Sequence, residues 1–285
     1  MDTATAVRPP TLLDMPQPPG APAASARHWT GRGQNFAVSW TRAGPGGGSR
    51  VPVESPDETM LLVLDAPVGI SGGNTSAEAA PRSVCILPPG AWQLDLRAGA
   101  TCVVLASLRE GAGAGALNEA AYQPRDARIV PVGPAWRPLR GATEVRIFSI
   151  DAVSASQDKP RLKMLQTATL SINWVEYAGP RDRHALSPHA HSAFEQGSLA
   201  LAGDFVHHLR APWGEDADAW HEDQHAPLGS PSLMVVPVHT IHTSEGVGPG
   251  HHLLIDVFSP PRADFIAKGW VANAGDYAAP DQAPA

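Results

Sequence analysis

The sequence predicts an all-β fold made of two similar β domains in tandem. Short apolar and β-branched runs recur along the chain between clusters of turn-forming residues, a spacing typical of a sandwich or barrel. Charged residues make up 17% of the 285 residues, whereas 29 are Pro and 27 are Gly, which favours many short strands over long charged helices. The two halves also resemble each other, which indicates an internal repeat.

The elements follow in order along the chain. Residues 1–28 are rich in Pro, Ala and Thr without periodicity, so we expect a flexible arm. The strand candidates of the first domain, 29–150, are QNFAVSW, TMLLVLDAPVGI, RSVCILPPGAWQLDL, ATCVVLASL, ARIVPVG and TEVRIFSI. Those of the second domain, 151–272, are LSINWVEYAG, GSLALAGDFVHHL, SPSLMVVPVH and HHLLIDVFS. We expect helices only at GALNEAAY and RADFIAKGWV, and a tail over residues 273–285.

Three matched segments carry the repeat. FAVSWTRAGPGGG matches LSINWVEYAGPRD, DETMLLVLDAP matches FEQGSLALAGD, and CILPPGAWQ matches MVVPVHTIH. The aligned positions are Trp40 with Trp174, Glu58 with Glu195, and Pro88 with Pro237. The second copy is longer, mainly through a loop-like insertion at 211–227, which we interpret either as a solvated loop or as a lid over a pocket. A second metal site at its histidines is disfavoured, because flexible loops seldom fix ligand geometry.

The charge and the termini exclude several kinds of partner. A formal net charge of −7 leaves no basic footprint for nucleic acid or an anionic membrane. No apolar run approaches the roughly 20 residues that span a bilayer, and the N-terminus lacks the pattern of a secretion signal.

Cys85 and Cys102 lie in apolar runs and are expected as buried free thiols, with a disulfide as the alternative. We expect a cytoplasmic protein that binds a small molecule.

Histidine placement assigns the chemistry to the second domain. Eleven of the twelve histidines lie between His184 and His252. Within SPHAHSAFEQGSLALAGDF, His189 and His191 are two residues apart and therefore share one face of a strand. Glu195 keeps that parity if the strand continues without a bulge, and the Gly203–Asp204 pair suits a hairpin turn.

A further ligand must come from a distant strand, and VVPVHTIH offers His242 after a Pro-marked turn. Three imidazoles and one carboxylate suit a single divalent transition metal, namely Fe, Mn, Zn, Ni or Co. The expected metal ligands are His189, His191, Glu195 and His242.

The order His-x-His-x3-Glu-x7-Gly, followed by the turn with His242, resembles the two metal motifs of the cupin superfamily. The resemblance implies two double-stranded β-helix (jelly-roll) barrels, with the metal in the second. Two departures stand out: Gly203 lies one residue later than usual, and His239 stands where the motif commonly has Gly. The first copy has Pro52, Glu54, Glu58 and Gln93 at the ligand positions, which implies a degenerate cupin without metal.

The segment LLIDVFSPPRADF resembles one near the barrel end of some small cupins, including the type that opens unsaturated uronates. That likeness implies three catalytic roles: Asp256 as an acid/base, Phe258 as a pocket wall, and Arg262 as a carboxylate clamp. The alternative is a structural ion pair between Asp256 and Arg262. Asp256 and Phe258 share strand parity, so both are expected to face inward.

The remaining histidines occur in pairs of alternating parity. At most one of His207 and His208, and one of His251 and His252, can enter the barrel. His239 either lines the mouth of the site or lies in the turn.

The leading functional hypothesis is a metal-dependent cupin enzyme that acts on a keto acid, enol or uronate-like metabolite. Lewis-acid and acid/base chemistry would then give a reaction such as isomerisation. The alternatives are an Fe(II)-dependent dioxygenase and a non-catalytic metabolite-binding bicupin. Exposed sheet edges also leave a homodimer open.

Overall fold

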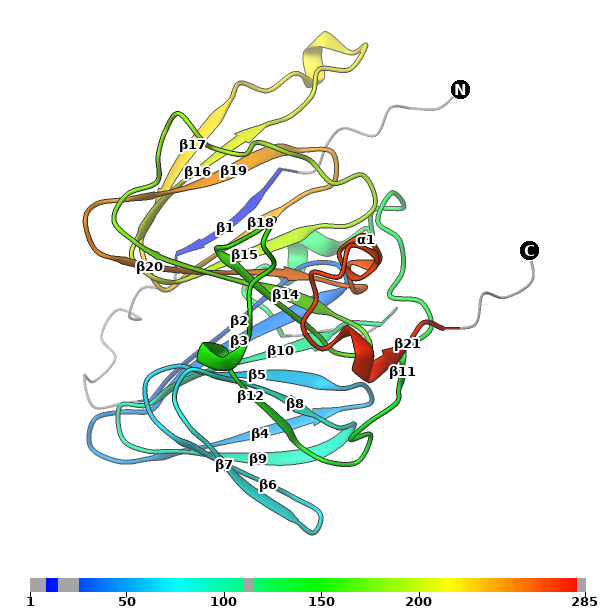
Figure 1. Cartoon of the computed structure of the whole chain (residues 1–285). Helices are drawn as coiled ribbons and strands as arrows, with labels where there is room; N and C mark the ends of the chain where they lie inside the picture. The colour runs from blue at the N-terminus through cyan, green and yellow to red at the C-terminus, as the bar shows by residue number, and fades with distance from the viewer. Residues whose placement is uncertain (1–8, 15–25, 110–114, 281–285) are drawn as a thin grey trace.

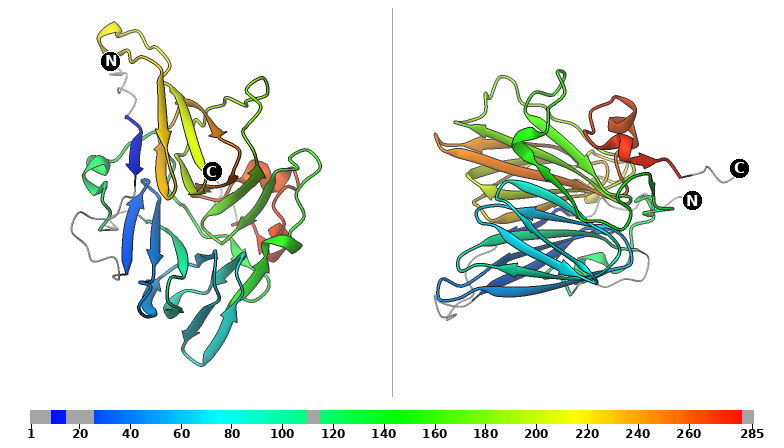
Figure 2. Two further views of the ribbon diagram at one scale, coloured as in Figure 1. Left: turned by 90° about the vertical axis from the view of Figure 1, so that its left-hand side faces the viewer. Right: turned by 60° about the horizontal axis from the view of Figure 1, so that its bottom comes forward.

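The computed structural model describes residues 9–14, 26–109 and 115–280 (Figure 1). Strands dominate these residues, and the one α-helix among them is the short α1 (Ala263–Ala267). In this part of the chain no helix has the length and apolar character needed to cross a membrane. The predicted all-β fold of two jelly-roll barrels in tandem is confirmed, and the two barrels are stacked one above the other (Figures 1 and 2).

The first barrel consists of a six-stranded and a four-stranded antiparallel sheet. The larger sheet has the order β12 (Arg146–Ser149), β8 (Ser83–Leu87), β5 (Thr59–Val63), β10 (Thr101–Ser107), β3 (Phe36–Arg42) and β2 (Arg27–Arg32). The smaller has the order β4 (Ser49–Ser55), β9 (Gly90–Leu96), β6 (Val68–Gly72) and β7 (Thr75–Ala79). Apolar side chains fill the space between them, including the free thiols of Cys85 and Cys102.

The second barrel pairs a six-stranded with a three-stranded antiparallel sheet. The larger sheet has the order β1 (Thr11–Asp14), β18 (Ser232–Val236), β15 (Gln196–Ala202), β20 (His251–Phe258), β14 (Ser171–Ala178) and β13 (Leu162–Gln166). The smaller has the order β17 (Gln224–Leu228), β16 (Asp204–Arg210) and β19 (Ile241–Val247). Here polar side chains from β15, β19 and β20 occupy part of the interior, which distinguishes this barrel from the first.

Among the described residues, one short strand lies within the expected arm and one within the expected tail, while residues 1–8, 15–25 and 281–285 of these segments lie outside the described residues. Within the expected arm, β1 adds a strand to the edge of the second barrel by pairing with β18. Within the expected tail, β21 (Tyr277–Ala278) pairs with β11 (Arg137–Pro138). Of the two expected helices, GALNEAAY gives the 3-10 turn η1 (Glu119–Tyr122), and RADFIAKGWV gives α1.

The two six-stranded sheets pack face to face and form the largest apolar core. Trp40 in β3 and Trp174 in β14, the aligned pair of the repeat, both lie in this core. The sheets approach closely at Gly31, where a Cβ would lie 2.7 Å from the Leu233 side chain, and at Gly197, where it would lie 2.8 Å from the Phe36 ring. A continuous apolar interface of this kind makes the barrels one packed body.

Hydrogen bonds across this interface are reciprocal. The Glu58 carboxylate accepts the backbone N–H of Ala168 at 2.9 Å, and the Glu195 carboxylate accepts that of Gln34 at 2.6 Å. Glu58 lies directly before β5 and Glu195 directly before β15, so the two occupy matching positions in the repeat. Each carboxylate accepts a hydrogen bond from the backbone of the other barrel. Both side chains are buried. The repeat therefore places Glu195 at the interface between the barrels.

A second reciprocal pair extends the repeat to segments that the sequence analysis did not align. The Asn118 side chain accepts Arg32 N–H at 2.9 Å and donates to Arg32 C=O at 2.8 Å. The Asn273 side chain bonds Gln166 in the same two-fold manner, at 2.9 and 2.8 Å. The two asparagines occupy matching places in ALNEAAY and VANAGDY.

Candidate metal centre and cavity

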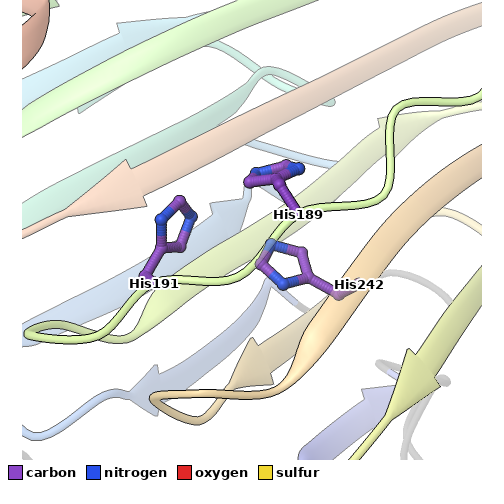
Figure 3. A group of neighbouring side chains, drawn as sticks. All are labelled: His189, His191 and His242. Carbon is purple, nitrogen blue, oxygen red and sulfur yellow. The ribbon is translucent and has the colours of Figure 1, made fainter.

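Three histidines converge inside the second barrel (Figure 3). The nitrogen atoms that His189, His191 and His242 offer lie within 4.8 Å of one another. His189 and His191 come from the segment before β15, and His242 from β19. Two backbone hydrogen bonds join His189 to His242, at 2.8 and 3.1 Å, and fix the distance between these segments.

The hydrogen bonds of two imidazoles select the tautomer suited to a ligand. His189 Nδ1 lies 2.9 Å from the Ser187 carbonyl oxygen, and His242 Nδ1 lies 2.9 Å from that of Thr240. Each Nδ1–H therefore donates to a carbonyl, which leaves the lone pair on Nε2. Burial lowers the pKa of His191 to about 3 and that of His242 to about 4, so both rings are neutral at pH 7, the form that binds metal.

Glu195 does not join the three histidines, contrary to the expected ligand set. Strand β15 begins only at Gln196, after a bend over residues 192–193, so the parity counted from His191 does not carry over. The Glu195 carboxylate turns to the Gln34 backbone instead.

Gln196 occupies the place expected for Glu195. Its Oε1 lies 3.0 Å from His191 Nε2 and 3.2 Å from His242 Nε2. The sequence held a signal for this residue, because counting from Gln196 removes the one-residue excess in the spacing to Gly203. Gly203 itself has a φ of 85°, in the hairpin turn between β15 and β16.

The donor set of three imidazole nitrogens and one amide oxygen fits a divalent transition metal. Gln196 Nε2 donates to Ser198 Oγ and to Asp256 Oδ1, both at 2.9 Å, which fixes Oε1 toward the histidines. The lone pair of His242 Nε2 then faces the lone pairs of Oε1. Lone pairs that face each other repel, and a cation bound between these two atoms would replace that repulsion with attraction to both.

Asp256 and Phe258 both face the cavity, as their parity predicts. Asp256 Oδ1 accepts hydrogen bonds from Gln196 and, at 3.1 Å, from Ser198. Burial raises the pKa of Asp256 to about 6 despite these bonds. The Phe258 ring packs edge-on against His191, with centroids 5.5 Å apart.

Arg262 forms its ion pair with Asp264, not with Asp256. The pair is bidentate, with both N···O distances at 2.7 Å. The guanidinium also stacks over Phe265 at 3.6 Å and lies near Phe194 and Phe258. The alternative of a structural Asp256–Arg262 ion pair is therefore wrong, and Arg262 belongs to the cavity wall.

A cavity of about 550 Å³ opens from the histidines to the surface. Its lining includes the exposed segment 158–161 and, from the segment after β20, the side chains of Arg262, Asp264, Phe265, Lys268 and Trp270. Among the described residues, none of the insertion 211–227 lines this cavity, and the insertion projects beyond the ends of β16 and β17 (Figure 1). The interpretation of this insertion as a lid is not supported.

In each of the two remaining histidine pairs, one side chain is buried and the other is more exposed, as the alternation of side chains along a strand predicts. His207 and His252 are fully buried, while His208 is half-buried and His251 is exposed. His239 is exposed and lies in the turn after β18 with a φ of 67°, the left-handed conformation for which the motif commonly has Gly.

The first barrel places its matching residues differently. Pro52 and Glu54 are exposed on β4, and Glu58 anchors the interface. Within the described residues, the grouping of possible metal ligands is confined to the three histidines of the second barrel.

Comparison with known proteins identifies the architecture. No protein-family model matches the chain, and no curated protein is significantly similar to it in sequence. AerE from Microcystis aeruginosa superposes with a TM-score of 0.56 at 9% identity, over 87% of this chain and 98% of AerE. Coconut cocosin gives 0.55 at 12%, over 89% and 86%. A Bacillus subtilis oxalate decarboxylase mutant gives 0.52 at 12%, over 84% and 73%.

The chain has the cupin fold. The structural neighbours share this fold, in agreement with the fold that the motifs imply. At these identities the likeness concerns the fold, so the chemistry has to be argued from the site itself.

Proposed function

We propose that the protein is a metal-dependent bicupin enzyme that acts on a small carboxylate-bearing metabolite. The second barrel, formed by residues 151–272 with β1 added at its edge, holds one divalent transition metal through His189, His191, His242 and Gln196. The first barrel, within 29–150, is a degenerate partner without metal. The observation that carries the proposal is the Gln196 oxygen, held by its own amide donors against two imidazole nitrogens at the head of a cavity.

The bound metal would supply Lewis acidity toward a carbonyl or enol oxygen of the substrate. All four proposed donors are uncharged, so the ion would keep its full double charge and attract an anion more strongly than a site with a carboxylate ligand.

Asp256 is the proposed acid/base. A carboxyl with a pKa of about 6 exists in both protonation states near neutral pH, as a group that takes and returns a proton must. Gln196 and Ser198 orient its Oδ1. Gln196 thus contacts both the metal position and the acid/base, which keeps the two in a fixed relative geometry.

The charge at the mouth of the cavity favours an anionic substrate. Lys159, Arg161, Arg181 and Lys268 line the cavity and outnumber Asp158 and Asp256, the two acids of the lining that are not paired with Arg262, in a chain whose formal net charge is −7. Arg262 is already paired with Asp264, so these four cations are better placed than Arg262 to attract a carboxylate.

Proton exchange tests the proposal without knowledge of the natural substrate. The metal-loaded protein is incubated in D2O with a panel of 2-keto acids and uronates, and deuterium incorporation is followed by NMR. We expect incorporation that disappears in Asp256→Asn and persists in Asp158→Asn, a matched change at the mouth. Oxygen uptake with the iron form would instead assign a dioxygenase, and binding without either signal a metabolite-binding protein.

A further inference from the structure

Two histidines face each other on the outer surface of the three-stranded sheet, away from the cavity. His208 in β16 is the direct cross-strand partner of His225 in β17. Their Nδ1 atoms lie 2.7 Å apart, in a hydrogen bond in which one ring donates and the other accepts. Because side chains alternate along β16, His208 faces outward while its neighbour His207 faces the barrel interior.

A buried carboxylate contacts the His208 ring at the nitrogen that does not face His225. Glu245 in β19 accepts a hydrogen bond from His208 Nε2 at 3.0 Å. Its side chain is only 8% exposed and also pairs with Arg183 at 3.1 Å. The carboxylate holds the proton of His208 on Nε2 and leaves the lone pair on Nδ1, which is how carboxylates orient histidine ligands at metal sites.

We propose that His208 and His225 form a second cation site, for a late divalent transition metal such as Cu(II) or Ni(II). Two cis nitrogens at about 2 Å from a tetragonal ion are roughly 2.8–2.9 Å apart, whereas tetrahedral ligands are about 3.3 Å apart. The observed separation is close to the tetragonal value. Water would complete the coordination, since His225 is exposed.

Occupation of this site would fasten the insertion to the barrel. β17 is the edge strand of its sheet and follows the exposed segment 211–223. A metal bridging His225 to His208 would tie this edge to β16 by a second kind of bond, in addition to the backbone ladder.

The test is a Cu(II) titration of the tag-free, metal-stripped full chain, followed by calorimetry and electron paramagnetic resonance. We expect two equivalents in the wild type, one in His225→Ala and one in His242→Ala, whose remaining spectrum shows coupling to two nitrogens. His221→Ala, a matched exposed histidine of the same insertion, should retain two. His225 is chosen because it is exposed on an edge strand, so its loss is compatible with folding.

The outcomes separate this site from the cavity site. Uptake lost only in His225→Ala would support the outer site while refuting the central one. Equal uptake by wild type and His225→Ala, or no uptake by His242→Ala, would overturn the outer site.

Discussion

Exchanging the roles of Glu195 and Gln196 gives the sharpest test of the site geometry. Glu195→Gln keeps the size of the side chain but replaces the charged acceptor of the Gln34 N–H with a neutral one. Hydrogen bonds to charged groups contribute about 1.5–3 kcal/mol, and this bond is buried. For a chain of this length, with an unfolding entropy of about 0.6 kcal/mol/K, that corresponds to a fall in melting temperature of about 2.5–5 °C. Metal affinity should not change.

Gln196→Leu should show the opposite pattern. It removes the amide oxygen that faces two imidazoles, and with it one of four proposed ligands. Since loss of even an outer partner weakens metal binding about 10–100-fold, we expect at least that loss here. Affinity is measured by competition with a chromogenic chelator, and stability by thermal unfolding of the metal-free proteins. If Glu195→Gln lost the metal and Gln196→Leu kept it, the account of the ligand set would be wrong.

Three further predictions follow from individual side chains. The rate of proton exchange in the wild type should show an inflection near pH 6, and Asp256→Asn should abolish the exchange itself; exchange that persists with the same inflection would assign the proton transfer to another group. His207 is buried and its pKa is lowered to about 4, below the ordinary 6.5, so the unfolded chain binds the proton first and stability is lost as pH falls from about 6.5 to 4. This one group accounts for about 3 kcal/mol, so a His207→Phe variant should unfold with a shallower pH dependence, measured by denaturant titration of the metal-free protein. Gly203→Ala should destabilise the fold by at least about 1–2 kcal/mol, because φ is 85° and a Cβ would lie 2.6 Å from the His252 ring; an unchanged midpoint would contradict the turn geometry.

The strands and the three histidines were predictable because both depend on local periodicity. Alternation of apolar residues marks the strands, and the spacing of His189 and His191 is a property of extended backbone. The Pro-marked turn before β19 similarly located His242. These inferences need no knowledge of which segments pack together.

The fourth donor was not predictable in this way, because it depends on where one strand begins. A bend before β15 moves Glu195 to the interface between the barrels and brings Gln196 to the histidines. A single residue of register exchanges the two faces of a strand. The matched Glu58 was the available signal for an interface role, since it holds the same structural position in a copy where the described residues show no grouping of possible metal ligands.

Long-range pairing explains the other differences. β1 is a four-residue strand that is defined only by its partner β18, more than two hundred residues away. From composition we expected an arm here, because the sequence pattern of a four-residue strand does not differ from that of a loop.

Metal content tests the central claim most directly. The protein is purified without chelator or a nickel column, in a His225→Ala background that removes the outer histidine pair, and its metals are counted by plasma mass spectrometry. We predict about one equivalent of a divalent transition metal per chain, and none when His242→Ala is added. Absence of metal in both proteins, even after reconstitution, would contradict the metal centre and leave a binding or scaffold protein.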